Sequence, residues 1–292
     1  MNTGRSLASL SNAVGSGLTT LVLTAALALP AAAQLELLPD SEPQQVFGGT
    51  TRQLAVRWRN PGASAVTVEL HGRLLQASSG TVAPLGEWFW KKLEILPGQT
   101  VLESAAVPLP SVRAETRCLV QWVAGTNRVL GATEVRVYPA NLLTELRSLA
   151  GDHPVGLFDP QAQLKPLLER LGVEFADLEL SGIADFTGKL AIIGPFASAA
   201  NMPPDMPARI KHAAKKGAAI VWIQPPPARD EPLRPSFRCV ASSKGAIVVA
   251  QSYIVADLAD QPQSQINLLH LARLAIHPLP APIPEPSLLE TL

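Results

Sequence analysis

The sequence predicts a two-domain protein, in which an N-terminal all-β sandwich precedes a C-terminal α/β domain built on a doubly wound parallel sheet. Three observations support this fold class. The chain has 292 residues, which corresponds to about two domains of ordinary size. Pro accounts for 27 of them, a content that favours turns and strand ends over a helical bundle. The hydrophobic period changes near residue 139, from the alternation of strands to apolar strands separated by helices.

Residues 34–138 form the first predicted domain. Residues 52–59 alternate in polarity, with Leu54, Val56 and Trp58 on one face, as expected of a half-buried strand. Further strands are expected at residues 66–70, 92–96, 101–107, 117–123 and 133–138. Short strands in this number favour an antiparallel β-sandwich. The stretch resembles an immunoglobulin-like domain; the cysteine pair of antibody domains is missing, so the resemblance implies an architecture and no ligand.

Residues 139–277 form the second predicted domain. Apolar strands are expected at residues 153–159, 173–180, 189–196, 218–223 and 245–253. Helices are expected at residues 142–150, from near Lys165 to Gly172, and at residues 207–216 and 264–277. Continuously apolar strands that alternate with helices indicate a parallel sheet covered on both faces, as in doubly wound folds.

Three segments of the second domain carry a resemblance to a known family. In chain order, residues 155–159, 190–195 and 218–223 resemble the class I glutamine amidotransferase-like fold, which is flavodoxin-like. Active members carry a cysteine nucleophile on the turn after the last of these strands, and a late His-x-Glu pair. This chain has Gln224-Pro225-Pro226-Pro227 at that turn and lacks the pair. Proline offers neither a nucleophile nor an N–H donor, so the resemblance implies the fold of a pseudoenzyme, and no catalytic residue is predicted.

Residues 1–33 are predicted to be a signal peptide. Leu18–Leu29 carries no charge, and Pro30 and Ala31-Ala32-Ala33 follow it, which is the order of an apolar region and a cleavage site. The apolar region is shorter than the roughly 20 residues that span a membrane; an uncleaved anchor is the alternative. We therefore expect a periplasmic or secreted protein that meets the membrane only during export.

Charge and motifs exclude several classes of function. Lys and Arg number 24 and so do Asp and Glu, a balance that argues against a nucleic-acid partner. No dinucleotide fingerprint, P-loop or H-E-x-x-H motif occurs, so no cofactor and no metal are predicted. Export would permit a disulfide between Cys118 and Cys239, whereas burial as small hydrophobic residues is the other interpretation.

Asp159 is a candidate binding residue. It lies at the carboxyl end of the first apolar strand of the second domain, where open α/β sheets bind ligands. Because Pro160 follows it, Asp159 also fits the pattern of a helix N-cap before a proline at the first helical position.

Trp88 and Trp90 are the other candidate binding residues. In a strand they share a face and stand about 7 Å apart. Such a face can stack on sugar rings or dock a partner protein; the alternative is that both rings pack into the protein.

Residues 278–292 have Pro at alternate positions as far as Pro286, which predicts extended, polyproline-like backbone. Disorder and docking in a groove of a partner are both consistent with this composition.

The sequence as a whole favours an exported, non-catalytic binding or scaffolding protein of the cell envelope. Its expected partner is an envelope protein or a polysaccharide. One alternative is a hydrolase that acts on carbohydrate or amide substrates through a carboxylate at the strand ends, such as Asp159. Another is a structural module that holds a larger envelope complex through the sandwich and the Pro-rich tail.

Overall fold

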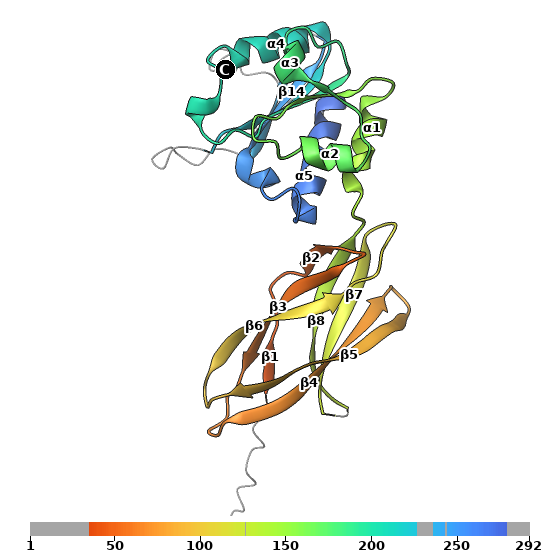
Figure 1. The fold of residues 1–292 in the computed structure, drawn as a ribbon, viewed down its shortest axis with the longest axis vertical. Coiled ribbons are helices and arrows are strands. Elements are labelled where there is room, and N and C mark those ends of the chain that lie inside the picture. The colour runs from red at the N-terminus through yellow and green to blue at the C-terminus, as the bar shows by residue number, and fades with distance from the viewer. Residues whose placement is uncertain (1–34, 126, 227–235, 243, 279–292) are drawn as a thin grey trace, which may run out of the picture. The chain divides into compact units, whose positions relative to one another are not determined.

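The computed structural model describes residues 35–125, 127–226, 236–242 and 244–278 (Figure 1). Its strands form three sheets, of three, five and six strands. The predicted signal peptide and almost all of the Pro-rich tail lie outside the described residues, so what the sequence predicts for them stays a prediction.

Eight strands lie between residues 36 and 138. They are β1 (Glu36–Leu38), β2 (Gln44–Phe47), β3 (Thr51–Arg59), β4 (Val66–Ala77), β5 (Val82–Ile95), β6 (Thr100–Pro108), β7 (Thr116–Ala124) and β8 (Arg128–Tyr138). One sheet has the order β1-β3-β6 and the other β2-β8-β7-β4-β5. All neighbouring strands are antiparallel except β2 and β8, which run parallel.

These two sheets share one hydrophobic core. The alternation of β3 buries Leu54, Val56 and Trp58 and exposes the residues between them, as the sequence predicted. Trp122 of β7 packs against Trp58 with its ring edge-on, at 6.2 Å between ring centroids. Its indole N–H donates to the Thr133 hydroxyl at 2.9 Å, which satisfies the one polar group of a fully buried ring.

The six-stranded sheet lies between residues 155 and 251. Its strands are β9 (Val155–Phe158), β10 (Phe175–Asp177), β11 (Leu190–Ile193), β12 (Ala219–Gln224), β13 (Phe237–Ala241) and β14 (Ala246–Gln251). The spatial order is β10-β9-β11-β12-β14-β13. All pairs are parallel except β13 with β14, so β13 forms an antiparallel edge.

Helices cover both faces of this sheet. The α-helices are α1 (Glu145–Ala150), α2 (Lys165–Arg170), α3 (Leu178–Ser181), α4 (Met206–Lys216) and α5 (Pro262–Ile276), with short 3-10 helices η1 (Leu142–Thr144), η2 (Ala199–Asn201) and η3 (Ser252–Val255). One core cluster joins α1, α2 and α5 to one set of alternate strand residues, and a second joins α3 and α4 to the other set. The strands are apolar throughout because both of their faces are buried.

The fold class predicted from the sequence is wrong as stated. It paired an antiparallel immunoglobulin-like sandwich with a doubly wound parallel sheet. The chain instead forms three sheets, two of which are mixed, because β2 and β13 run against the expected direction. Of the α-helices in the described part of the chain, only α4 and α5 are longer than six residues. The sequence pattern overlooked β1, β2 and β13, and polarity alone does not encode strand direction.

Part of the predicted strand at residues 173–180 is helical. The strand β10 ends at Asp177, and α3 begins at Leu178 because the Asp177 carboxylate accepts the N–H of Glu179. This side-chain acceptor is the ordinary N-cap interaction, which satisfies an amide that the helix leaves unpaired.

Both cysteines are free thiols in the structure, Cys118 buried and Cys239 exposed.

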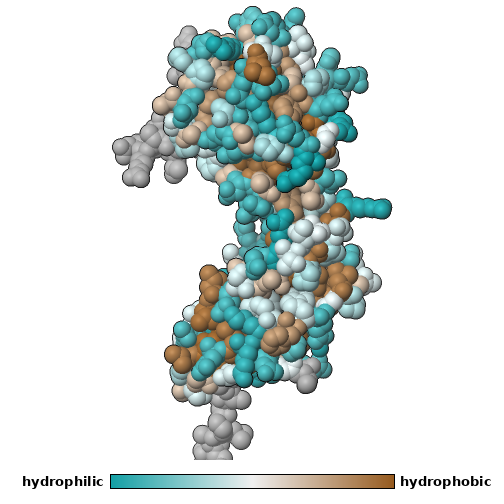
Figure 2. Space-filling model, in the orientation of Figure 1, coloured by the Kyte–Doolittle hydropathy of each residue, from teal (hydrophilic) through white to brown (hydrophobic). Residues whose placement is uncertain are grey.

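Most of the surface in Figure 2 is polar, with separate hydrophobic patches. In the described part of the chain, no helix is long and apolar enough to cross a membrane.

Candidate functional site

The carboxyl ends of the parallel strands meet at one edge of the six-stranded sheet. From β9 the chain passes to β10 on one side, and it returns to β11 on the other side. Where strand order reverses in this way, the two connections diverge and leave a crevice outside the strand ends, which is where open α/β sheets bind ligands. This edge is therefore the candidate ligand-binding region of the sheet.

Two adjoining cavities lie at this edge, with volumes of about 230 and 350 Å³. We call them together the carboxyl-edge crevice. Gln163 and Asp257 line both cavities. The first is also lined by Gln161, Phe196, Pro226, Ser252 and Tyr253, and the second by Ala162, Pro166, Leu167 and Arg170.

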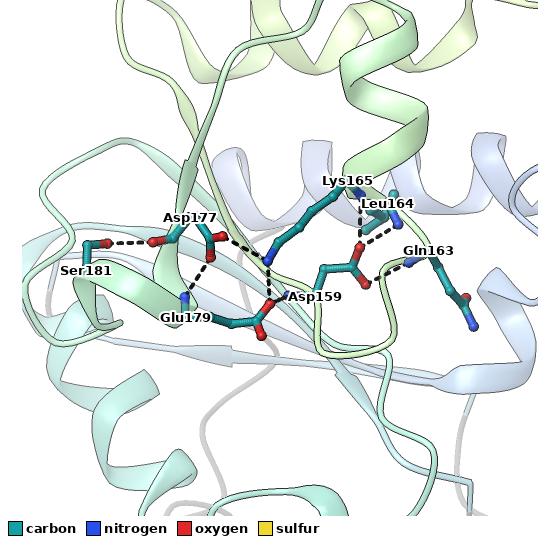
Figure 3. A network of polar contacts seen from close by, with 7 residues as sticks. All are labelled: Asp159, Gln163, Leu164, Lys165, Asp177, Glu179 and Ser181. Atoms are coloured by element: carbon teal, nitrogen blue, oxygen red, sulfur yellow. Dashed lines mark hydrogen bonds and ion pairs between the residues drawn. The ribbon is translucent and has the colours of Figure 1, made fainter.

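Asp159 fixes the backbone on one side of the crevice (Figure 3). Its carboxylate is buried, at 2% exposure. One oxygen accepts the N–H of Gln163 at 3.1 Å, and the other accepts those of Leu164 and Lys165 at 2.7 and 2.9 Å. Because three amides satisfy the buried charge, the segment after β9 is held in one conformation as it enters α2.

The two predicted roles of Asp159 have different outcomes. Asp159 is not the helix N-cap that the pattern with Pro160 predicted: Leu164 occupies that position, α2 begins at Lys165, and Pro160 lies in the preceding turn. The Asp159 carboxylate instead accepts backbone amides where the chain enters α2. Asp159 also lies at the carboxyl end of β9, as predicted, but it is not among the residues that line the crevice. Its contacts position the neighbouring Gln161 and Gln163.

The backbone beside the crevice adopts an uncommon conformation at two points. Among the described residues, Ala162 and Asp257 are the non-glycine residues with positive φ, at 49° and 55°. Both line the second cavity. The Ala162 N–H donates to the Asp159 carbonyl at 3.0 Å, so the Asp159 turn stabilises a conformation that costs an alanine on the order of 1–3 kcal/mol. Such backbone geometry often accompanies functional sites.

Lys165 joins the crevice segment to β10 and α3. Its ammonium contacts the carboxylates of Asp177 at 2.9 Å and Glu179 at 2.6 Å. The same Glu179 oxygen accepts the Asp159 N–H at 3.2 Å, and the Ser181 hydroxyl donates to the Asp177 carbonyl. Figure 3 shows the side chains of Lys165 in α2, Asp177 in β10 and Glu179 in α3 meeting beside Asp159, which follows β9.

The network shifts the pKa of two of its members. The hydrogen bond from Lys165 lowers the pKa of Asp177 below 3.8 against the opposing effect of burial, with help from the Glu179 N–H. Burial alone would lower the pKa of Lys165, but its hydrogen bonds to Glu179 and Asp177 outweigh burial and raise that pKa above 10.5. The lysine and aspartate therefore stay charged and paired near neutral pH.

The crevice lining includes amide and hydroxyl side chains, the exposed ring of Tyr253, and two charged residues of opposite sign, Arg170 and Asp257. The Gln163 side-chain amide donates to the Gln161 side chain at 3.0 Å, so the two are mutually oriented. Tyr253 is 60% exposed, and its hydroxyl lies 2.9 Å from that of Ser236. Phe196 packs against Phe158 at 6.1 Å between ring centroids. These groups can exchange hydrogen bonds with a neutral polar ligand and contact its apolar faces.

The turn after β12 borders the crevice. Gln224 ends the strand, and Pro225 and Pro226 follow. Pro226 lines the first cavity, at the point where the resemblance would require a cysteine nucleophile. Pro227, the last residue of the predicted turn, lies outside the described residues.

Trp88 and Trp90 share a face of β5, as predicted, and that face packs against the core of the first two sheets. The Trp90 ring lies 4.8 Å from that of Trp122 and 6.4 Å from that of Trp58, measured between centroids. Trp88 covers Gly72, where a Cβ would come within 2.4 Å of the indole. The exposed aromatic ring of this segment is Phe89, at 58% exposure. Neither tryptophan lines the crevice, and both are partly exposed.

Sequence reasoning missed the polar residues of the crevice. Gln161, Gln163, Tyr253 and Asp257 follow the ends of β9 and β14. Their place just after two apolar strands was the signal that could have found them, but only Asp159 was singled out there. In the described part of the chain, no three His, Cys, Asp or Glu side chains gather as metal ligands would.

Comparisons with known proteins leave the function open. No protein-family model matches the chain, and no curated protein matches it. Among solved structures, an alkylpurine DNA glycosylase from Pseudomonas fluorescens aligns with 37% of this chain and 31% of its own, at 14% identity and a TM-score of 0.29. A β-glucosidase from Listeria innocua aligns with 37% of this chain and 16% of its own, at 16% identity and a TM-score of 0.28. Each similarity spans less than a third of the other protein, and at such scores it carries no inference about fold or function.

We predict that Asp159→Ala lowers the free energy of unfolding by about 2–3 kcal/mol, because three amides lose a charged acceptor inside the protein. Asp159→Asn retains one acceptor oxygen and should lose less. Urea denaturation followed by circular dichroism measures both. The exposed Asp152→Ala is the matched control and should change stability by no more than about 0.5 kcal/mol. Equal effects at the two positions would refute the stabilising role of the Asp159 contacts.

The Lys165 network predicts a pH dependence of stability. Because folding lowers the pKa of Asp177, its stabilising contribution is present above the ordinary value of 3.8 and is lost as pH falls through the folded value. Because folding raises the pKa of Lys165, its contribution is present below 10.5 and is lost as pH rises through the folded value.

The measurement is the difference in unfolding free energy between wild type and Asp177→Asn across pH. It should be largest near neutral pH and shrink below about pH 4. Asp152→Asn serves as the exposed control. A difference for Asp177→Asn that stays constant into acid would show that its charge does not stabilise the fold.

Proposed function

We propose that this protein is an exported, non-catalytic binding protein of the cell envelope, periplasmic or secreted, and that it binds a saccharide in the carboxyl-edge crevice. Saccharides are neutral molecules whose hydroxyls both donate and accept hydrogen bonds. A scaffolding role with an envelope protein as partner is the competing form of the same proposal. The signal-peptide pattern of residues 1–33 supports export.

The chemistry of the crevice lining carries the proposal. Gln161 and Gln163 present both donors and acceptors, Ser252 and Tyr253 present hydroxyls, and Tyr253 presents an exposed ring. This combination of a few oriented polar groups with apolar surface is typical of small-molecule sites. Neutral amide and hydroxyl groups match a neutral polyhydroxylated ligand better than a charged one.

The placement of the carboxylates supports binding without catalysis. Asp159 is occupied by three amides, and Asp177 and Glu179 are paired with Lys165. Among the described residues that line the crevice, Asp257 is the one carboxylate. Glycoside hydrolysis usually requires two acids on either side of the scissile bond. The lining therefore favours recognition over hydrolysis.

A glycan array, followed by calorimetry on the best saccharide, tests the proposal. We predict that Gln163→Ala and Tyr253→Ala each weaken binding by about tenfold, because each removes a hydrogen bond or a contact face. Phe89→Ala is the matched control, since Phe89 and Tyr253 are similarly exposed aromatic residues at 58% and 60%. It should leave the affinity unchanged.

Three results would contradict the proposal. The array could show no saccharide bound, or Phe89→Ala could abolish binding while Tyr253→Ala does not. The third is turnover of the bound saccharide that Asp257→Asn stops, which would establish the hydrolase alternative.

A further inference from the structure

A further cavity, of about 500 Å³, lies on the face of the six-stranded sheet that α5 covers. We call it the α5 groove. Its wall is formed by Phe237 of β13, Ile254 of η3 and six residues of the α5 helix and its end, namely Asn267, His270, Leu271, Arg273, Leu274 and His277. None of them lines the carboxyl-edge crevice.

The groove has an apolar floor. Leu271 is buried at 3% exposure, and Ile254 and Leu274 are partly buried against the same core cluster. Phe237 stands at the edge strand of the sheet and is 46% exposed. A large exposed aromatic ring beside a partly open aliphatic floor is surface that an apolar ligand can remove from water.

The ionisable residues that line the groove are all basic. They are His270 and Arg273 in the second half of α5 and His277 just after it. No Asp or Glu is among the lining residues. Glu145 of α1 binds the Arg273 guanidinium through Nε and Nη2, at 2.8 and 2.7 Å. This pairing holds the guanidinium in place and offsets its charge. The Nη1 donors and the two exposed imidazoles are the donors that remain for an anion.

We propose that the α5 groove binds an aliphatic carboxylate, with its hydrocarbon chain on Phe237, Ile254, Leu271 and Leu274 and its carboxylate at the basic rim. The cavity volume lies within the range of about 300–1,000 Å³ of small-molecule sites. Hydrogen-bond complementarity selects the head group: imidazole and guanidinium N–H groups donate, and a carboxylate accepts through both of its oxygens. This site is separate from the saccharide crevice, so either proposal can fail alone.

Calorimetry on the full-length protein with decanoate and decanol, below their aggregation concentrations, tests the inference. The two probes share a chain and differ in the head group. We expect decanoate to bind about tenfold more tightly than decanol, which corresponds to one charge-assisted hydrogen bond. The double variant His270→Ala/His277→Ala should reduce this preference, with His71→Ala in β4 as a matched control that leaves it unchanged.

Variants of the floor separate the groove from non-specific binding. Phe237→Ala removes an exposed ring and leaves the core intact, so it should weaken both probes. Leu274→Gln should do the same, and circular dichroism verifies the fold of each variant. Absence of decanoate binding, equal affinity for decanol, or indifference to Phe237→Ala would overturn the inference. So would a concentration-dependent dimer that Phe237→Ala dissociates, since the groove would then hold a second copy of the chain.

Discussion

The buried carboxylate of Asp159 is the interaction on which the candidate site depends. A charge at 2% exposure is costly unless hydrogen bonds replace its water, and three successive backbone amides do so here. The same contacts hold the chain as it leaves β9 and enters α2, and the Asp159 carbonyl accepts the N–H of Ala162 in its left-handed conformation. Without them the side chains of Gln161 and Gln163 would have no fixed position at the strand ends.

The six-stranded sheet carries two candidate sites of different chemistry. At its carboxyl edge, Asp159, Asp177 and Glu179 are occupied by amides and by Lys165, so amide and hydroxyl side chains line the crevice beside one acidic and one basic residue, Asp257 and Arg170. On the α5 face, an aliphatic floor meets a basic rim. The two candidate sites share no lining residue, although η3 contributes Tyr253 to the crevice and Ile254 to the α5 groove.

How far the sequence predicts this structure depends on the range of the interactions involved. The face of Leu54, Val56 and Trp58 follows from alternation, and the place of Asp159 at the carboxyl end of β9 follows from the end of an apolar run. The pattern with Pro160 predicted an N-cap at Asp159, and it was wrong because the carboxylate accepts amides four to six residues further along the chain. The direction of β2 and β13 depends on which distant strand each one meets, so the predicted fold class was wrong. Trp88 and Trp90 share a face as expected, but alternation does not tell which side of the sheet is buried. The crevice joins residues near 161 to residues near 257, which only the tertiary fold brings together.

Hydrogen exchange of the full chain, with and without a mixture of soluble envelope saccharides, tests the central claim most directly. If a saccharide occupies the carboxyl-edge crevice, exchange should slow in the peptides that contain residues 161–165 and 252–257. Exchange in β5, which carries Trp88 and Trp90, should stay unchanged. Protection confined to β5, or no protection anywhere, would contradict the account.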